Sequence, residues 1–321
     1  MLKSFTKNKL LVILGPTSTG KTDLAISIAE KLNGEIVSAD SRQVYKYLNI
    51  GTGKLPINEV DVKKKNGFWI MNGIKVWLYD LLDPQLQFNL YEYILEAKDV
   101  IKKISESGKF PILVGGTGLY IRSLLEGVSD FGTEKKTDLR KELEGLDIQE
   151  IINRILLLNP KILENLNNSE AKNARRLIRI FEKLSSPSET KRTFFGIRKH
   201  FNVLKVGLKV DRKILREKIR QRVLLRIDQG MLEESENLIT REILTYERME
   251  ELGLEYKYIA KFLKGEIKSE KELVEILSLK IGQFAKRQMT WFKREKGVFW
   301  FDISEKNFME KVEKKVRDWY N

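Results

Sequence analysis

The chain of 321 residues contains no cysteine and a single histidine, His200. The lack of cysteine excludes disulfides, thiolate metal sites and a cysteine nucleophile, and one histidine argues against a histidine metal cluster or a serine-type triad. No apolar run approaches the roughly 20 residues that a membrane-spanning helix needs, and we find no secretory signal. We therefore expect a protein of the reducing cytoplasm with no membrane partner.

Most of the excess positive charge lies in the second part of the chain. The net charge is +14; residues 1–130 carry 17 Lys and Arg against 14 Asp and Glu, whereas residues 131–321 carry 42 against 31. A cationic excess confined to one region favours a polyanionic partner, with nucleic acid the leading candidate. Lysine used freely on solvated helix faces would give the same totals, so charge alone leaves both interpretations open.

A glycine loop stands between an expected strand and an expected helix near the start of the chain. Residues 10–14 are all apolar and predict a strand buried on both faces, and residues 23–30 have helical periodicity. The connecting residues, Gly15-Pro16-Thr17-Ser18-Thr19-Gly20-Lys21-Thr22, match the phosphate-binding P-loop pattern. In such a loop, backbone N–H groups and the helix N-terminus bind phosphate oxygens, Lys21 contacts the outer phosphates and Thr22 ligates Mg²⁺. The motif predicts a di- or triphosphate site without specifying the ligand.

Two polar clusters follow later strands. Asp40 ends the strand expected at 35–40, where a ligand crevice lies in open α/β sheets, so its carboxylate could accept a proton or hold Mg²⁺ through water. Gly115-Gly116-Thr117-Gly118 follows an apolar strand at 110–114 and could offer a hydroxyl and N–H groups to a leaving group. An aspartate that caps a loop and a glycine turn that packs on a helix are the alternatives, and both stay open.

Strands and helices alternate in the first part of the chain, which predicts an α/β fold: a P-loop NTPase-like parallel sheet with helices on both faces. Residues 51–75 suggest a loop or hairpin, and helices are expected at about 248–264 and 269–295. Helix follows helix from about residue 133, and a strand returns at 201–208, so we expect a small all-helical insertion domain. The predicted segments are 1–132 for the first part of the core, 133–198 for the insertion and 199–321 for the second part with its basic C-terminal helices.

Arginine and lysine recur on the expected helices. On the basic helix at 212–229, Arg222 could reach the phosphate loop and offset charge on a leaving diphosphate. Arg175, Arg176 and Arg179 fall on one helix face at a spacing that suits backbone phosphates. For each arginine taken alone, an ordinary surface charge is the alternative.

Five motifs of the chain resemble, in order, successive motifs of the tRNA dimethylallyltransferases, from about residue 9 to residue 302. They are the P-loop, Ser38-Ala39-Asp40-Ser41-Arg42-Gln43-Val44-Tyr45, Ile50-Gly51-Thr52-Gly53-Lys54, Leu113-Val114-Gly115-Gly116-Thr117-Gly118-Leu119-Tyr120 and Ala285-Lys286-Arg287-Gln288-Met289-Thr290-Trp291-Phe292.

The resemblance implies a transferase that moves a dimethylallyl group from dimethylallyl diphosphate to N6 of the adenosine at tRNA position 37, just 3′ of the anticodon. Diphosphate is released and N6-isopentenyladenosine is formed. Lys21, Thr22 with Mg²⁺, Thr117 and Arg222 would stabilise the departing diphosphate, and Asp40 would accept the proton of the attacking amine. The adenosine would be flipped out of the anticodon loop to reach this site.

The resemblance also implies the residues that contact tRNA. Asp40, Ser41, Arg42, Gln43 and Thr117 would surround the target base, while Arg175, Arg176, Arg179, Lys286, Arg287 and Gln288 would contact the anticodon stem. The expected cofactor is Mg²⁺, the expected partners are tRNA and dimethylallyl diphosphate, and the protein is expected to be a monomer. Whether ATP also binds the loop is left open.

The chain departs from the family pattern at three places, Val76–Asp80, Gly253–Tyr258 and Gly282. These positions affect the expected tRNA contacts more than the transfer chemistry. Three other functions are the alternatives: an adenylate isopentenyltransferase acting on free AMP, ADP or ATP, a P-loop small-molecule kinase, and an RNA-binding protein without activity. A free nucleotide needs no basic helical insertion, and kinases lack the later motifs, so tRNA prenylation is the favoured prediction.

Overall fold

The computed structural model of the protein describes residues 8–57, 60–129, 137–162, 166, 171–185 and 193–321. Two compact units make up the chain: the larger combines Met1–Glu126 with Gly196–Asn321, and the smaller is Gly127–Phe195. The smaller unit is thus inserted into the sequence of the larger. The predicted start of the insertion, residue 133, lies outside the described residues.

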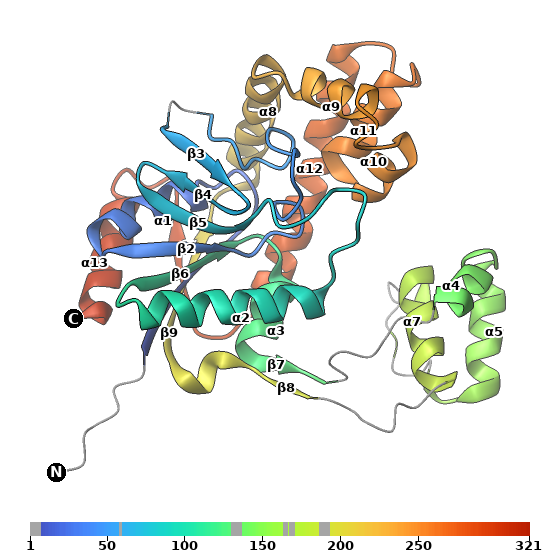
Figure 1. Ribbon diagram of the computed structural model, residues 1–321, viewed down its shortest axis with the longest axis horizontal. Helices are drawn as coiled ribbons and strands as arrows, with labels where there is room; N and C mark the ends of the chain where they lie inside the picture. Colours follow the sequence, from blue (N-terminus) through green and yellow to red (C-terminus); the bar gives the residue numbers. More distant parts are fainter. Residues whose placement is uncertain (1–7, 58–59, 130–136, 163–165, 167–170, 186–192) are drawn as a thin grey trace. The chain divides into compact units, whose positions relative to one another are not determined.

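The larger unit is built on an eight-stranded sheet in the order β10-β9-β1-β6-β2-β5-β4-β3 (Figure 1). All neighbouring pairs from β10 to β5 are parallel, and β4 and β3 add an antiparallel edge where a loop or hairpin was expected. The largely parallel α/β sheet is therefore confirmed. The strands are β1 (Asn8–Leu14), β2 (Gly34–Ser38), β3 (Val62–Lys65), β4 (Gly67–Met71), β5 (Ile74–Tyr79), β6 (Phe110–Gly115), β9 (Phe201–Lys209) and β10 (Val298–Asp302).

Helices cover both faces of this sheet (Figure 1). Because side chains alternate along a strand, the apolar run of β1 serves both faces. Leu11 and Ile13 lie in one buried core together with apolar residues of two helices, α1 (Lys21–Lys31) and α13 (Phe308–Tyr320). α2 (Leu90–Glu106) and α3 (Gly118–Glu126) pack against each other and on β6.

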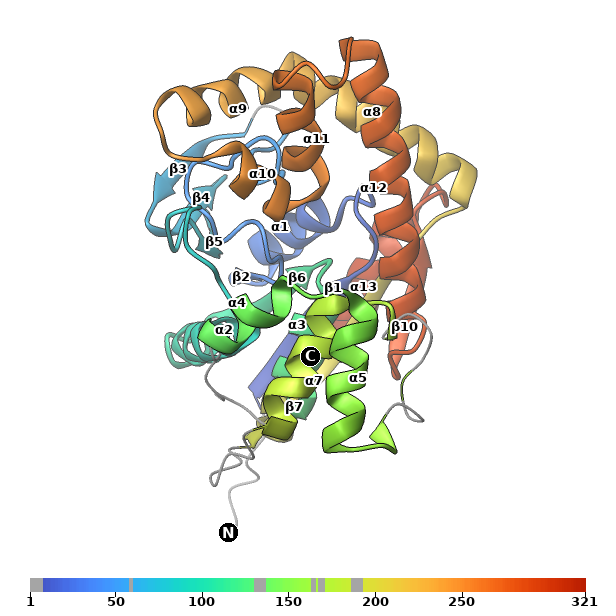
Figure 2. The same ribbon diagram turned by 90° about the vertical axis from the view of Figure 1, so that its right-hand side faces the viewer.

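A second layer of helices packs around a separate core of the larger unit (Figure 2). It comprises α8 (Arg212–Asp228), α9 (Met231–Thr240), α10 (Tyr246–Leu252), α11 (Leu254–Leu263) and α12 (Glu270–Phe292). The single helix expected at 248–264 was wrong, because Gly253 takes φ 76° and separates α10 from α11. Only glycine adopts this backbone conformation readily.

The smaller unit contains α4 (Thr137–Glu144), α5 (Ile148–Leu158) and α7 (Ala174–Ser185), with apolar residues such as Ile151 and Leu177 in its core. Its ends pair as two short antiparallel strands, β7 (Gly127–Val128) and β8 (Phe194–Phe195). Among the residues described in the two units, no helix has the length and apolar character needed to cross a bilayer.

Candidate active site

The phosphate loop joins β1 to α1 at the carboxyl edge of the parallel sheet. Gly15 has φ 148°, and a Cβ atom there would lie 2.6 Å from the backbone oxygen of Leu208 in β9. Ser18 and Gly20 also have positive φ, 64° and 75°. Such left-handed positions turn successive N–H groups inward, which is the geometry of an anion-binding nest.

The side chains of the loop are held close to its own backbone. The Lys21 ammonium donates to the backbone oxygen of Pro16 at 2.7 Å, and the hydroxyl of Thr19 donates to the same oxygen at 2.8 Å. Burial, followed by the charge of Arg222, lowers the pKa of Lys21 to about 7. A bound anion would therefore stabilise the charged form of this lysine.

Two neighbouring strand ends bring Asp40 and Thr117 together. The N–H of Thr117 donates to the backbone oxygen of Ala39 at 3.1 Å, and the N–H of Ser41 donates to the Thr117 hydroxyl at 3.3 Å. Asp40 accepts the N–H of Arg42 at 2.9 Å, which fixes one of its carboxylate oxygens. The two clusters that the sequence singled out thus form one hydrogen-bonded rim.

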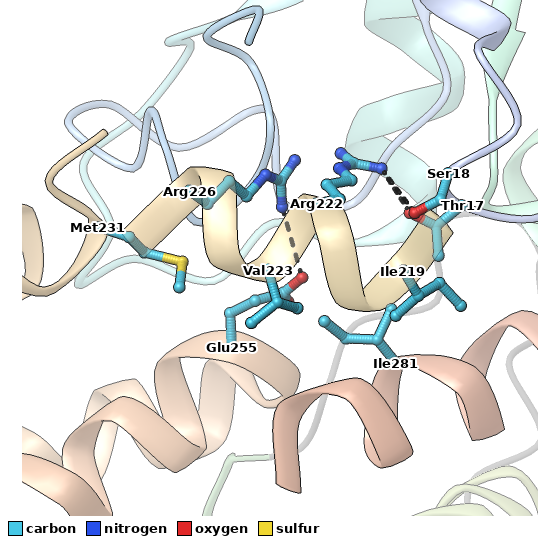
Figure 3. Close-up of a pocket in the computed structure, with 9 residues that line it drawn as sticks. All are labelled: Thr17, Ser18, Ile219, Arg222, Val223, Arg226, Met231, Glu255 and Ile281. Atoms are coloured by element: carbon cyan, nitrogen blue, oxygen red, sulfur yellow. Dashed lines mark hydrogen bonds and ion pairs between the residues drawn. The ribbon is translucent and has the colours of Figure 1, made fainter. Parts of the chain in front are cut away.

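Two arginines of α8 lie near each other and have different partners. Arg222 turns to the phosphate loop and donates to the hydroxyls of Thr17 at 2.8 Å and Ser18 at 3.5 Å, whereas Arg226 turns to Glu255, 3.6 Å away (Figure 3). Burial lowers the pKa of both guanidinium groups, and the charge of Glu255 opposes both shifts.

Asp40 also opposes the lowered pKa values of Lys21 and Arg222. Its carboxylate is therefore within electrostatic range of both cations. The site combines the anion-binding loop after β1, the cations Lys21 and Arg222, and the carboxylate of Asp40, which follows β2, two strands from β1 in the sheet. These groups are suited to bind a phosphate-bearing group and to accept a proton beside it.

The loop after Leu48 lies against the arginines of α8 and is bound by α9. The carboxylate of Glu234 in α9 accepts three consecutive backbone N–H groups, those of Asn49, Ile50 and Gly51, at 2.9 to 3.3 Å. Arg226 donates to the backbone oxygen of Gly51 at 3.1 Å.

Gly53, in the same loop, has φ 70°. A Cβ atom at this position would lie 1.8 Å from Nη2 of Arg226 and 2.4 Å from Nη2 of Arg222. A glycine is therefore required for both guanidinium groups to lie against this loop.

Other residues singled out in the sequence have different surroundings. Gln43 is half-buried. Its Oε1 accepts a hydrogen bond from the hydroxyl of Ser38, and its Nε2 donates to the backbone oxygen of Thr52. Lys286 and Arg287 are exposed on α12 and line a shallow surface hollow. Gln288, expected to contact tRNA, is only 6% exposed, and its side chain bonds to the protein itself, to Thr17 and Gly116.

In the smaller unit, the three arginines of α7 are not equivalent. Arg175 and Arg176 are exposed, whereas Arg179 is half-buried and pairs with Glu182 at 3.0 Å. Arg140 of α4 pairs with the same carboxylate. Arg140 therefore joins α4 to α7 through Glu182, and Arg179 pairs with the same carboxylate from within α7.

The donor set at the phosphate loop fits Mg²⁺ bound together with a phosphate ligand. Within the described part of the chain, no group of three or more His, Cys, Asp or Glu side chains is placed to hold a metal ion. Mg²⁺ commonly takes one or two protein oxygens and completes its shell with phosphate oxygens and water. Thr22, half-buried in the first turn of α1, would supply such an oxygen.

The sequence did not indicate that Glu234 and Glu255 contact the site. It predicted that Gln288 contacts tRNA, whereas the side chain bonds to Thr17 and Gly116. Glu234 stands on an amphipathic helix with other acidic residues, where a solvated charge is the ordinary expectation. Glu255 was within a segment that departs from the family pattern. The carboxylates became recognisable only when the fold brought them to Gly51 and Arg226.

The strand, phosphate loop and helix, with a carboxylate on a nearby strand end, define a P-loop protein of the group-transfer class. The family model described as IPP transferase matches residues 43–295, and one described as Isopentenyl transferase matches residues 8–75. The chain belongs to the IPP transferase family.

Relatives and solved structures agree with this assignment. The chain is 38% identical over 288 residues to tRNA dimethylallyltransferase 2 of Treponema denticola, covering 90% of this chain and 92% of the relative. It is 36% identical to the tRNA dimethylallyltransferase of Lactococcus lactis, over 98% and 99% of the two chains. The tRNA isopentenylpyrophosphate transferase from Bacillus halodurans superposes with a TM-score of 0.68 at 29% identity, over 97% and 96% of the two chains. A eukaryotic dimethylallyltransferase acting on tRNA gives 0.74 at 25% identity, over 96% of this chain and 78% of the other.

Proposed function

We propose that this protein transfers the dimethylallyl group of dimethylallyl diphosphate to N6 of the adenosine at tRNA position 37. The observation that carries the proposal is the hydrogen bond of Arg222 to the hydroxyls of the phosphate loop, beside Lys21 and Asp40. A cation fixed on the loop by α8 suits a leaving diphosphate, and a carboxylate nearby suits a nucleophile that must lose a proton. Family membership and relatives named for this activity support the same reaction.

The bonds and charges of the reaction assign a part to each group. The N6 lone pair attacks C1 of the prenyl donor, the N–C bond forms, and the C1–O bond breaks with its electron pair leaving on the diphosphate. Lys21, Arg222 and the hydroxyl of Thr117 stabilise the negative charge that develops on this leaving group. Asp40 accepts the proton that N6 releases.

The N6 amine of adenosine is a weak nucleophile, so catalysis depends mainly on stabilising the leaving diphosphate and on aligning the amine with the allylic carbon. Holding the amine within about 3–3.5 Å of the allylic carbon contributes through proximity alone. The hydrogen bonds between Ser41 and Thr117 and between Arg42 and Asp40 keep both functional groups in place before either substrate arrives. Mg²⁺, held by Thr22, would supply further charge neutralisation on the diphosphate.

The RNA side of the proposal rests on charge and exposure. Arg175 and Arg176 are exposed on α7 and Lys286 and Arg287 are exposed on α12, so each can meet a backbone phosphate. Ser41, Arg42 and Gln43 flank Asp40 and are proposed to contact the flipped-out adenosine and its neighbours. We propose that one copy of the chain suffices for both tasks.

The experiment uses isotopically labelled dimethylallyl diphosphate with three acceptors. We expect label on an unmodified tRNA with adenosine at position 37, and none on the same tRNA with guanosine there, because the guanosine has no N6 amine. Free AMP is the third acceptor. Label on AMP but not on tRNA would assign the adenylate isopentenyltransferase reaction instead, and phosphate transfer from ATP would assign a kinase.

A further inference from the structure

The side chain of Gln288 bridges the two loops that face the proposed leaving group. Its Oε1 accepts the backbone N–H of Thr17 in the phosphate loop at 2.9 Å, and its Nε2 donates to the backbone oxygen of Gly116 at 3.0 Å. Both ends of one amide are therefore used, one on each loop. At 6% exposure, water does not compete effectively for either bond.

The chemistry of the amide explains why this position holds glutamine. Bridging an N–H group and a carbonyl requires one acceptor and one donor at the end of the same side chain, and an uncharged glutamine provides both. A carboxylate offers only acceptors, and a lysine only donors. The length of the side chain also matters, because the amide must reach from the backbone of α12 to both loops.

Glycines on the partner loop make room for this bridge. A Cβ atom on Gly116 would lie 2.3 Å from Nε2 of Gln288, and a Cβ atom on Gly118 would lie 2.1 Å from Cδ1 of Trp291, one turn further along α12. Any larger residue would push α12 away from the turn that carries Thr117. The packing of a glycine turn on a helix, one of the two interpretations left open by the sequence, is therefore confirmed, while the role of Thr117 towards a leaving group stays a prediction.

The bridge acts on the residue that Arg222 also contacts. Thr17 donates its N–H to Gln288 and accepts the guanidinium of Arg222 through its hydroxyl, at 2.9 and 2.8 Å. Backbone and side chain of one loop residue are thus fixed from two helices, α12 and α8. Rotation or drift of the loop would break one of these bonds.

We propose that Gln288 is a positioning residue that sets the separation between the phosphate loop and the Thr117 turn, and that it makes no contact with RNA. This inference rests on the proposed function for its kinetic consequences. In the reaction, both loops would have to grip the same diphosphate, and misplacement of catalytic groups by about 1 Å can lower a rate by about 10²-fold.

The first test is Gln288→Met, which keeps the length of the side chain and removes both hydrogen bonds. We expect kcat to fall about 10- to 100-fold, while the Kd for tRNA and its dependence on salt stay within twofold of the unaltered protein. The matched control is Gln85→Met. Gln85 is an exposed glutamine that also bridges two segments, donating to the backbone oxygen of Glu242 at 3.1 Å, and its loss should leave kcat unchanged.

The second test does not depend on prenyl transfer. Pyrophosphate with Mg²⁺ is titrated calorimetrically into both variants, and hydrogen exchange is followed for the peptide that contains Thr17. Gln288→Met should weaken pyrophosphate binding at least fivefold and speed exchange at the Thr17 amide. If the labelled-donor experiment failed while these changes appeared, the proposed reaction would be wrong and the positioning role would stand.

A third variant, Gln288→Glu, separates a positioning role from a general loss of stability. Its ionised carboxylate keeps the acceptor for Thr17 and lacks the donor for Gly116, whereas the protonated carboxyl has both. We expect its kcat, relative to that of the unaltered protein at the same pH, to rise as the pH falls. A pH-independent ratio, unchanged kcat in Gln288→Met, or a loss of tRNA affinity of more than about fivefold in Gln288→Met would each overturn the proposal.

Discussion

Arginines have different surroundings in the two units of the chain. In the larger unit, Arg222 and Arg226 lie against the phosphate loop and Glu255, and burial lowers their pKa values. In the smaller unit, Arg175 and Arg176 are exposed on α7. A buried cation is fixed and little screened by salt, which suits a developing charge at a defined place, whereas exposed cations suit a mobile and extended polyanion.

The contrast extends to how each set is supported. Arg226 bonds to a backbone oxygen of Gly51, and Glu234 fixes that loop through three N–H groups. In the smaller unit, the pair Arg140–Glu182 joins α4 to α7, and Arg179 pairs with the same carboxylate from within α7. Substitutions can therefore test whether residues at the phosphate loop affect the rate of transfer and whether exposed arginines of the smaller unit affect tRNA binding.

The largest effect should follow from Asp40→Asn. Asparagine keeps the size of the side chain but accepts no proton, so we expect turnover to fall by about 10²–10⁴, as is typical for loss of a general base. The Kd for tRNA should change by no more than a few-fold, since Asp40 is proposed to accept a proton and not to contact the tRNA backbone. Single-turnover rates with bound labelled donor measure this directly, and unchanged turnover would remove Asp40 from its role.

Arg222→Met should lower turnover by about 10²–10³, because it removes a positive charge from the leaving group. Arg222→Lys should recover only part of the rate, since the ammonium group is a compact point charge on a shorter side chain and lacks the planar guanidinium whose Nη1 reaches the loop hydroxyls. Arg241→Met, at an exposed arginine after α9, is the control and should leave the rate unchanged. Equal rates in the Arg222 and Arg241 variants would contradict a special role for the buried cation.

The pH dependence of pyrophosphate binding should report Lys21. Its pKa is lowered to about 7 in the free protein, and a bound anion favours the charged form, so binding takes up a proton above pH 7. Affinity should therefore decrease by up to about tenfold per pH unit above 7, relative to Lys21→Arg, whose guanidinium stays charged. Calorimetry at pH 8 in two buffers of different ionisation enthalpy measures the proton. No difference between the two proteins would rule out titration of Lys21.

The smallest effect should come from Arg175→Ala, on the docking side. We expect a few-fold loss of tRNA affinity and a salt dependence less steep by about 0.7–0.9 units, with kcat unchanged at saturating tRNA. Arg154→Ala is the control within the same unit, because Arg154 pairs with Glu142 at 2.5 Å and should add nothing to the slope. Equal slopes for both variants would deny Arg175 a phosphate contact.

Much of the fold could be predicted because its signals are local. The apolar run of β1 and the glycine loop after it encode strand, turn and helix within a few residues, and the structure places all three as expected. The break at Gly253 was missed because the apolar spacing continues across it into α11, and one glycine within a helical pattern is a weak signal.

The site residues likewise include some that the sequence could predict and some that it could not. Lys21, Asp40 and Thr117 lie in segments that follow parallel strands, so their grouping at one sheet edge could be deduced from the order of strands and helices along the chain. The partners of Glu234 and Gln288 are far away in sequence, and a single chain contains no pattern that pairs a carboxylate with Asn49 or an amide with Thr17. Such contacts depend on tertiary packing.

The pairing of β1 with β9 has a consequence for synthesis on the ribosome. β9 begins at Phe201 and Gln288 lies later still, so the phosphate loop leaves the exit tunnel long before either of its supports. In the nascent chain, the phosphate loop and the edge of β1 that pairs with β9 therefore lack their partners until most of the polypeptide has been made. Translation speed through the inserted unit thus sets how long that edge stays exposed to chaperones and to other chains.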